Sequence, residues 1–478
     1  MFKDSLTPKT PLWEALQKQL AQVKHRFHVP AHQAGVGVYD SRRAELDLTE
    51  LAHLDNLFYP TGALAESQDL LAKSFGSEKS YYLVNGSSGG IIAAIWSLCQ
   101  PGDKVIVSRN VHRSVITGIV LSGAEPRFVP VEDFNSGIPL NINVNNFESI
   151  LAETEKPRAV IINSPSYWGV APNLYQLGQI AQEKGLPLIV DEAHGGHFIF
   201  HHQFPLSARD CGSDLWVNSA HKTLGALTPG ALLHRQGKRV NINALEDALS
   251  MFQTSSPPYP VLASLEAVKD EQNRDWEAVI SLAQYAKEQI NQGKGFFCLE
   301  IPENRQGVES EFEMDPLRLT VLTREVSLNG YQVGKLLREE YGIEVEMSGL
   351  HYVLAIAHPQ HEKKDMDALV RALKNIENNY PGEGWKTGDM EQTYPIPSLA
   401  VTPRGAAQGR KQKIPLEEAG GCVSAATVYP FPPGIPALIP GELIQEETLQ
   451  RLKDLSSQGA SVPGLGPAPH RHILVMAE

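Results

Sequence analysis

The sequence is poor in cysteine, and its four cysteines stand far apart. They form no CxxC pair and no dense framework of the kind that small secreted domains need. We therefore expect reduced thiols in a cytoplasmic protein. The four positions are Cys99, Cys211, Cys298 and Cys422.

A long apolar run is also missing. No stretch of about 18 apolar residues occurs, and a membrane-spanning helix needs at least that length. The N-terminal stretch MFKDSLTPKTPLWEALQKQL is polar and amphipathic, without the continuous apolar core of an export signal. We expect neither export nor a membrane partner.

Basic side chains are in the minority, with 42 Lys and Arg against 55 Asp and Glu and a formal net charge of -13. Such a charge repels nucleic-acid phosphates at long range, so no nucleic-acid partner is expected and a cationic substrate is favoured. One short basic run, RGAAQGRKQK, lies within the polar stretch Ser398–Glu418. This composition predicts a mobile, solvated loop.

The length and composition of the chain are those of a large folded protein. Its 478 residues and 42% apolar content predict two or three packed units. After Asp47, short apolar runs alternate with amphipathic stretches, which is typical of β/α units around a mostly parallel sheet. The seven expected strands cover residues 81–84, 104–108, 126–131, 159–164, 186–191, 215–219 and 230–234.

Other patterns divide the chain further. Apolar residues at helical spacing predict an N-terminal helix over Pro11–Lys24. A smaller α+β unit begins near Lys294, with strands in FFCLEI, LRLTVLT and HYVLAIA and a helix in LNGYQVGKLLREEYG. The expected regions are an N-terminal helix and linker (1–46), a large domain (47–293), a small α+β domain (294–385) and a C-terminal domain (386–478).

Polar residues just after the expected strands carry the chemistry, because ligands of such sheets bind beyond the carboxyl ends of the strands. Asp191 ends LPLIVD, and Lys222 follows LWVNS. A buried amine can form an imine with the aldehyde of pyridoxal 5'-phosphate (PLP), and a carboxylate can pair with the ring nitrogen. YYLVNGSSGGIIAAI offers a glycine-rich turn and a helix N-terminus for the phosphate, and His112 follows KVIVS as a flat partner for the ring.

A metal site is a weaker interpretation of the histidines at the DEAHGGHF segment. His194, His197, His201 and His202 are close in sequence, but zinc needs a closed set of ligands. His194 already has a use beside the cofactor. We therefore expect no metal.

Ordered segments spread over nearly the whole chain resemble the Orn/Lys/Arg decarboxylases, a bacterial group of fold type I PLP enzymes. The segments that carry the resemblance are FHVPAHQAG, LTELAHLDNLFYPTGALAESQDLLAKSFGS, YYLVNGSSGG, PGDKVIVSRNVHRSVITGIVLSGAEP, NSPSYWGVAPNL, VDEAHGGHF, SAHKTLGALTPGALL, TSSPPYPVLASLE and YPFPPGIPALIPGE. The resemblance implies a PLP-binding large domain with a mostly parallel seven-stranded sheet, a smaller α+β domain and a C-terminal segment. It also implies a homodimer or a dimer of dimers.

The resemblance implies a role for each matching position. Lys222 is similar to the Schiff-base lysine, Asp191 to the partner of the ring nitrogen, and His112 to the residue stacked on the ring. The other implied contacts are Ala193 on the opposite ring face, Ser87, Ser88 and Gly89 at the phosphate turn, Ser219 and His221 at the same end, and His194 near the ring oxygen or the substrate carboxylate.

The chain departs from the family pattern at three points. Ala31 stands where the family commonly has glycine, and Pro229 where it has glutamine. The N-terminal wing domain of the large inducible members has no counterpart, so we do not expect the decamers that depend on it.

The implied reaction is decarboxylation of lysine, arginine or ornithine. Lys222, His194 and His221 are all candidates for the acid that returns a proton to Cα, and a carboxylate is needed for the distal cation of the substrate. Its candidates are Glu442, Glu344 and Glu346.

Other functions stay open. Transamination would need an arginine on the α-carboxylate, for which Arg318 is the main candidate, although a structural salt bridge is an equal interpretation. Aldol cleavage, or a PLP-binding regulatory protein with little turnover, are the remaining alternatives.

Overall fold

The computed structural model describes most of the chain. The described residues are 9–22, 45–51, 54–134, 138–301, 311–383, 396–431, 434–457, 460–467 and 471–477. Ala31, one of the departures from the family pattern, lies outside these ranges.

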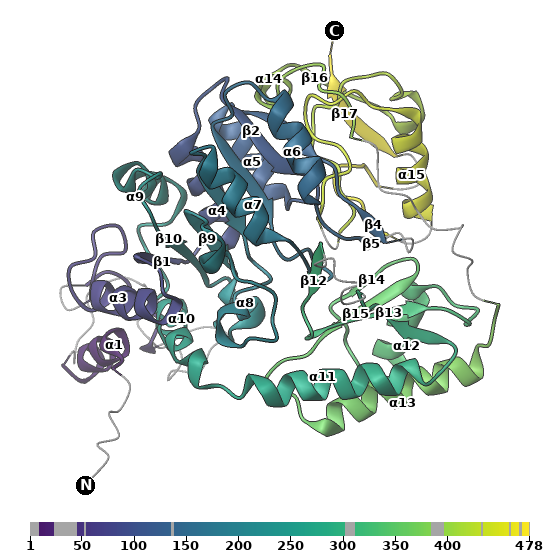
Figure 1. Cartoon of the computed structure of the whole chain (residues 1–478), viewed down its shortest axis with the longest axis horizontal. Helices are drawn as coiled ribbons and strands as arrows, with labels where there is room; N and C mark the ends of the chain where they lie inside the picture. The colour runs from purple at the N-terminus through teal and green to yellow at the C-terminus, as the bar shows by residue number, and fades with distance from the viewer. Residues whose placement is uncertain are drawn as a thin grey trace.

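A seven-stranded sheet forms the centre of the large unit, in the order β1-β10-β9-β8-β6-β2-β3 (Figure 1). The five strands from β9 to β3 are parallel, and β10 pairs antiparallel with both of its neighbours. All seven strands occur where the sequence predicts them. They are β1 (Lys79–Leu83), β2 (Lys104–Ser108), β3 (Glu125–Val129), β6 (Ala159–Asn163), β8 (Leu188–Asp191), β9 (Leu215–Asn218) and β10 (Ala231–Arg235).

Helices cover both faces of this sheet, which explains why its strands are continuous apolar runs. In β2, Val105 and Val107 join the core under α4, α5 and α9, whereas Ile106 joins the core under α6 and α7. Successive side chains of a strand point to opposite faces, so every residue of the run is buried. These helices are α4 (Gly86–Leu98), α5 (Arg113–Ser122), α6 (Val144–Glu153), α7 (Leu174–Glu183) and α9 (Ile242–Phe252).

The small unit is a four-stranded sheet in the order β11-β13-β15-β14 with helices packed on it. Helices α11 and α13 run side by side along it (Figure 1). Strand β12 (Phe312–Met314) pairs antiparallel with β7 (Val170–Pro172), and this short ladder ties the small unit to the large one. The other elements are α11 (Trp276–Asn291), β11 (Phe296–Cys298), β13 (Arg318–Thr323), α12 (Gly330–Tyr341), β14 (Met347–Ser348), β15 (Tyr352–Ile356) and α13 (Lys363–Asn379).

The C-terminal region corrects one prediction. The stretch Ser398–Glu418 is not simply a mobile loop: it contains α14 (Pro403–Gln408), β16 (Lys411–Pro415) and the turn η4 (Leu416–Glu418). Strand β16 pairs antiparallel with β17 (His472–Met476), about sixty residues away in sequence. Its polar side chains are exposed, so the order comes from main-chain pairing with a distant strand, which local composition does not report.

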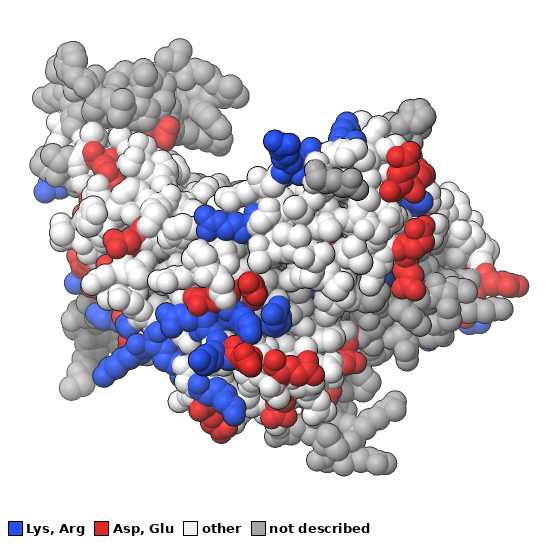
Figure 2. Space-filling model, turned by 90° about the horizontal axis from the view of Figure 1, so that it is seen from above, with Lys and Arg blue, Asp and Glu red and all other residues white. Residues whose placement is uncertain are grey.

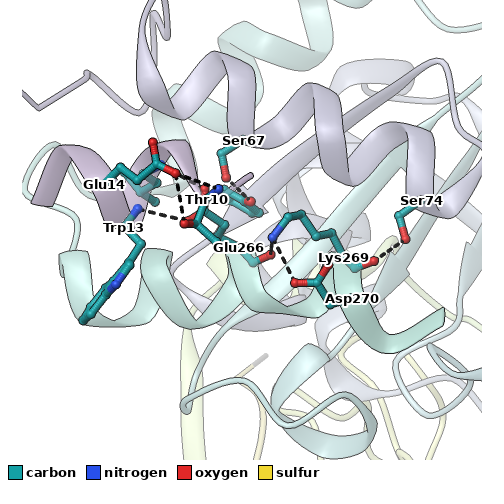
Figure 3. Close-up of polar contacts among 10 residues, drawn as sticks. Thr10, Trp13, Glu14, Ser67, Ser74, Glu266, Lys269 and Asp270 are labelled. Atoms are coloured by element: carbon teal, nitrogen blue, oxygen red, sulfur yellow. Dashed lines mark hydrogen bonds and ion pairs between the residues drawn. The ribbon is translucent and has the colours of Figure 1, made fainter. Parts of the chain in front are cut away.

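Helix α1 (Pro11–Gln22) confirms the predicted N-terminal helix within the described residues. It is held by a buried carboxylate of α10 (Tyr259–Ala267): Glu266 accepts hydrogen bonds from the main-chain N–H groups of Leu12 and Trp13 at 2.9 and 3.0 Å (Figure 3). These N–H groups have no partner inside the helix, and the carboxylate also meets the positive end of the helix dipole. Nearby, the half-exposed Asp270 pairs with Lys269.

The surface carries both signs of charge. On the face drawn in Figure 2, Lys and Arg side chains gather in one group with Asp and Glu side chains along its border. Neighbouring charges of opposite sign are usual on solvated surfaces. Within the described ranges, no helix is both long and apolar enough to cross a membrane.

Replacing Glu266 should loosen α1. In Glu266→Gln, one acceptor of the pair becomes a donor that faces an N–H group, at a cost of about 1–2 kcal/mol. Hydrogen exchange of the α1 amides should therefore accelerate on the order of 5- to 30-fold. Asp270→Asn, on the same segment, should leave α1 exchange unchanged; equal exchange in wild type and Glu266→Gln would contradict this account.

Candidate active site

Two adjacent parallel strands end at the residues expected to carry the chemistry. Strand β8 ends at Asp191, and β9 is followed at once by Ser219 and the short helix α8 (Ala220–Thr223), which contains Lys222. The strands pair with Asp191 beside Val217. Because parallel strands place their carboxyl ends at one edge of a sheet, Asp191 and Lys222 emerge at the same edge.

Lys222 is half-buried. Its Nζ is 2.9 Å from Nε2 of His194. Burial lowers the pKa of Lys222; the Asp191 carboxylate opposes this shift, and the Arg318 guanidinium adds to it. The environment therefore favours an amine with a free lone pair, which is the nucleophilic form.

The partners of His194 assign its tautomer. Arg318 Nη2 lies 3.1 Å from His194 Nδ1 and 3.2 Å from the His194 carbonyl oxygen. Arginine can only donate, so Nδ1 must accept. Burial, with the nearby Lys222 and Arg318 charges, holds the pKa of His194 well below its usual range. The neutral ring then carries its proton on Nε2, the nitrogen that faces Lys222 Nζ.

Asp191 is a buried carboxyl group with little compensation. Its Oδ1 accepts a hydrogen bond from the Ala193 amide at 3.2 Å. Burial raises the pKa of Asp191 against the opposing effects of the Lys222 charge and the Ala193 amide. A cationic N–H group brought to this carboxylate would lower its pKa and keep it ionised. Ala193, a small buried side chain, follows two residues later.

A second cluster lies at the start of α4. Ser219, after β9, donates a hydrogen bond from its Oγ to the Ser87 Oγ at 2.7 Å. Gly86 begins the helix at φ 73°, a left-handed conformation that glycine tolerates, and Pro229 lies against it. The hydroxyls of Ser87 and Ser219 thus meet at a helix N-terminus, where free N–H groups favour an anion. Ser88 is half-buried and Gly89 is buried in the same first turn.

His112 caps helix α5. Its Nδ1 accepts the main-chain N–H of Ser114 at 3.2 Å, which leaves the proton of the neutral ring on Nε2. Burial lowers the pKa of His112 to about 4, helped by the Lys222 and Arg113 charges. Gly434 of the YPFPPGIPALIPGE segment packs on this ring, since a Cβ there would lie 3.5 Å from His112 Cδ2.

His221 has a different fixed orientation. Its main-chain N–H and its Nδ1 both contact the Gly230 carbonyl oxygen, at 3.1 and 3.0 Å. A carbonyl only accepts, so Nδ1 carries the proton and Nε2 keeps its lone pair. Burial lowers the pKa of His221.

The three candidate distal glutamates occupy different environments. Glu346 accepts a hydrogen bond from Tyr167 Oη at 2.6 Å, and its charge acts on Lys222. Glu344 is exposed and pairs with Arg338 at 2.7 Å. Glu442 is fully buried and pairs with Arg109 at 3.1 Å. Only Glu346 of the three is tied by these contacts to the Lys222 cluster.

Several residues of the site were not singled out from the sequence. The Tyr167 ring contacts the His194 ring at a centroid distance of 4.5 Å. Tyr167 follows β6 at the same sheet edge, so its position was a usable signal. Asp315 lies behind Arg318, and His197 Nε2 is 3.2 Å from Asp315 Oδ2. The local sequence MDPLRLTV does not indicate the contact between Asp315 and His197.

The histidines of the DEAHGGHF region have separate partners. His197 contacts Asp315, and His201 Nε2 lies 3.0 Å from Glu277. In the part of the chain that the structure describes, no three His, Cys, Asp or Glu side chains are grouped so as to hold a metal ion.

The sequence matches two models of one family. The Orn/Lys/Arg decarboxylase major domain matches residues 10–365, and the C-terminal domain of that family matches residues 389–470. The chain belongs to the Orn/Lys/Arg decarboxylase family. The arginine decarboxylase of Bacillus subtilis (strain 168) is 35% identical over 472 residues, which cover 96% of each protein. The arginine decarboxylase of Halalkalibacterium halodurans is 34% identical, with 98% of each covered.

Solved structures share the fold of this family member. The constitutive lysine decarboxylase of Escherichia coli superposes with a TM-score of 0.82 at 22% identity, covering 98% of this chain and 82% of that one. An alanine–glyoxylate aminotransferase of Nostoc reaches a TM-score of 0.53 at 17% identity, covering 79% and 97%. The predicted fold type I architecture and the predicted family are therefore confirmed, and with them the enzyme class, a PLP-dependent amino-acid decarboxylase.

Glu192, next to Asp191, should make stability depend on pH. Its carboxylate is buried, accepts hydrogen bonds from the Ala208 amide and Asn218 Nδ2, and has its pKa raised by burial from 4.5 to about 7. As pH rises between these values, the unfolded chain loses this proton and the folded chain retains it. The free energy of unfolding should therefore fall, by at most about 1.4 kcal/mol per pH unit.

The comparison is the melting temperature of wild type and Glu192→Gln from about pH 4.5 to 7. Wild type should lose stability relative to this variant as pH rises, because the variant has no proton to release. Glu183→Gln, at an exposed position in α7, should follow wild type. Parallel curves for wild type and Glu192→Gln would show that Glu192 does not titrate in this range.

Proposed function

We propose that this decarboxylase binds PLP through Lys222 and removes the α-carboxylate of a basic L-amino acid, L-arginine in the first instance. One observation carries the proposal: the Lys222 amine, whose pKa is lowered by burial, lies at the same sheet edge as the buried, poorly compensated Asp191 carboxyl group. The arginine decarboxylases at 33–35% identity support the choice of arginine.

The residues present fit PLP. Asp191 would hold the ring nitrogen as a cation, because a buried carboxylate with one main-chain hydrogen bond is stabilised by an N–H⁺ partner. Ser87, Ser88, Gly89 and Ser219 would hold the phosphate at the α4 N-terminus, with His221 at the same end. His112 would cover one ring face, and the small Ala193 leaves room at the other.

When bound, PLP supplies an aldehyde that condenses with amines and a ring that takes up the electrons of the broken Cα–carboxylate bond. The chain contributes orientation and proton control. The Tyr167 and His194 side chains lie beside Lys222 Nζ and reduce the access of water to it. A site poor in water favours the loss of a charged carboxylate as carbon dioxide. His194, with its proton on Nε2 facing Lys222, can pass a proton toward Cα through the amine; Lys222 and His221 remain the other candidates.

Arg318 bears on the choice between decarboxylation and transamination. Its side chain is fully buried; Nη2 is bonded to His194, and Nη1 is buried with no hydrogen-bond partner among the described residues. His194 therefore lies between this guanidinium and Lys222. The family and its relatives support decarboxylation, and the unpaired Nη1 of Arg318 keeps transamination as the alternative.

Glu346 is the carboxylate that we propose for the distal cation. It extends from the segment before β14, its side chain is exposed, and one oxygen is already oriented by Tyr167. A guanidinium presents a planar pair of N–H groups that matches a carboxylate. Glu344 and Glu442 are less suited because each already pairs with an arginine of this chain.

Lys222→Ala tests the cofactor assignment. The purified wild type should show the visible absorbance that PLP acquires on condensing with a lysine amine, and should release carbon dioxide and agmatine from arginine. In Lys222→Ala the absorbance should disappear and turnover should fall at least about 10⁴-fold. The exposed control Lys184→Ala should behave as wild type. Undiminished turnover in Lys222→Ala would refute the proposal.

Glu346→Gln tests the distal contact, with Glu344→Gln as the matched control two residues away. Loss of a charge-assisted hydrogen bond costs about 1.5–3 kcal/mol, so KM for arginine should rise on the order of 10- to 100-fold with a smaller change in kcat. Glu344→Gln should leave KM unchanged. A larger effect in Glu344→Gln than in Glu346→Gln would transfer the assignment to Glu344.

A further inference from the structure

A continuous chain of polar contacts runs from the small unit to Lys222. Asp315 Oδ2 accepts from Arg318 Nε at 3.3 Å, Arg318 Nη2 donates to His194 Nδ1 at 3.1 Å, and His194 Nε2 is 2.9 Å from Lys222 Nζ. Asp315 and Arg318 are fully buried, and His194 is nearly so. Water therefore cannot easily replace Asp315, Arg318 or His194 in this series of contacts.

Arg318 contacts His194 at two atoms. The same Nη2 atom contacts the ring Nδ1 and the main-chain carbonyl of His194, so it restrains both the ring rotation and the tautomer. A histidine with Nδ1 occupied by a donor can keep its neutral ring only with the proton on Nε2. The geometry thus directs one N–H toward the lysine.

A glycine in the main chain lets the Arg318 side chain lie close to it. Gly169, at φ 89°, faces the Arg318 side chain, and a Cβ at this position would lie 2.3 Å from Arg318 Cγ. The Gly169 carbonyl also accepts the Asp315 amide at 2.8 Å. The glycine therefore permits the close passage of the arginine stem beside the ladder that joins the two units.

Asp315 supplies the charge that holds Arg318. It accepts hydrogen bonds from Arg318 Nε at 3.3 Å and from the Leu317 amide at 3.0 Å, and His197 Nε2 lies 3.2 Å from its Oδ2. The His197 and Arg318 interactions outweigh burial and lower the pKa of Asp315 to about 2. The Asp315 carboxylate thus compensates the buried guanidinium.

We propose that Arg318, held by Asp315, is a positioning residue that keeps His194 in its Nε2–H form and thereby keeps the Lys222 amine neutral and ready to condense with PLP. The inference rests on the proposed function of Lys222. It assigns to the small unit a part in forming the cofactor site, through His194.

Other charged and titratable groups also lie near His194 and Lys222, and the variants of Arg318 leave these groups unchanged. His194 is faced by Lys222, Arg318, His112, His221 and the Tyr167 ring. Lys222 is faced by Asp191 and Arg318, with Glu346 further out and His112 beside it. Only the Arg318 position is changed.

The first test follows the rate at which PLP develops its visible absorbance on the cofactor-free chain from about pH 6 to 9. If Lys222 is kept neutral as proposed, the rate for wild type should be nearly independent of pH. In Arg318→Met it should fall about 10-fold or more at pH 7 and recover about 10-fold per pH unit on raising the pH. Arg324→Met, on the residue after β13 and stacked on Phe297, should behave as wild type.

Arg318→Lys keeps the test informative if Arg318→Met does not fold. An ammonium retains the charge but lacks the planar fork that contacts Asp315 and His194 together, so an intermediate, pH-dependent slowing is expected. A wild-type profile in either folded variant overturns the proposal. So does an equal loss at every pH, which is what a purely structural role would cause, or a rise in KM for arginine alone, which would mean that Arg318 binds substrate.

The second test needs no cofactor. The ¹⁵N spectrum of histidine-labelled, cofactor-free chain, with His194 assigned by its loss in His194→Asn, should show His194 protonated on Nε2 and not on Nδ1. Arg318→Met should abolish this state. A wild-type His194 protonated on Nδ1 overturns the inference. If the tautomer is as expected but PLP never condenses with Lys222, the proposed function fails and the tautomer assignment stands.

Discussion

The contact on which the site depends is the partly buried hydrogen bond between His194 Nε2 and Lys222 Nζ, 2.9 Å long. An ammonium in this position would lose hydration and lie near the Arg318 charge, and both effects lower the pKa of Lys222. The parallel pairing of β8 and β9 makes the contact possible, because it brings the residues after both strands to one edge. Asp191 then lies at the same edge without being hydrogen-bonded to the lysine.

The two units of the chain meet at this contact. Strand β12 of the small unit extends β7 of the large one, and Asp315 and Arg318 follow directly. A shift of the small unit relative to the central sheet would therefore change the contact between Arg318 and His194. The same unit carries Glu346, which Tyr167 of the large unit contacts. Residues of both units therefore surround Lys222.

Much of the central sheet was predictable, because its strands are uninterrupted apolar runs separated by amphipathic helices, and that pattern is local. Asp191 and Lys222 could be singled out because each directly follows a strand. The Arg318–His194 contact could not, since it joins residues 124 apart and depends on a glycine at 169. The pairing of Glu442 with Arg109, far away in sequence, is likewise a contact that the local motif does not indicate. The polar residues of β16 are ordered by β17, which their composition does not indicate.

The central claim is that one particular amine, Lys222 Nζ, carries the cofactor. Borohydride reduction of the PLP-loaded protein would make that bond permanent, and mass spectrometry of the proteolytic peptides would locate it. The account predicts a single pyridoxyl label on the peptide that contains Lys222. A label on another lysine, with the Lys222 peptide unmodified, would contradict it.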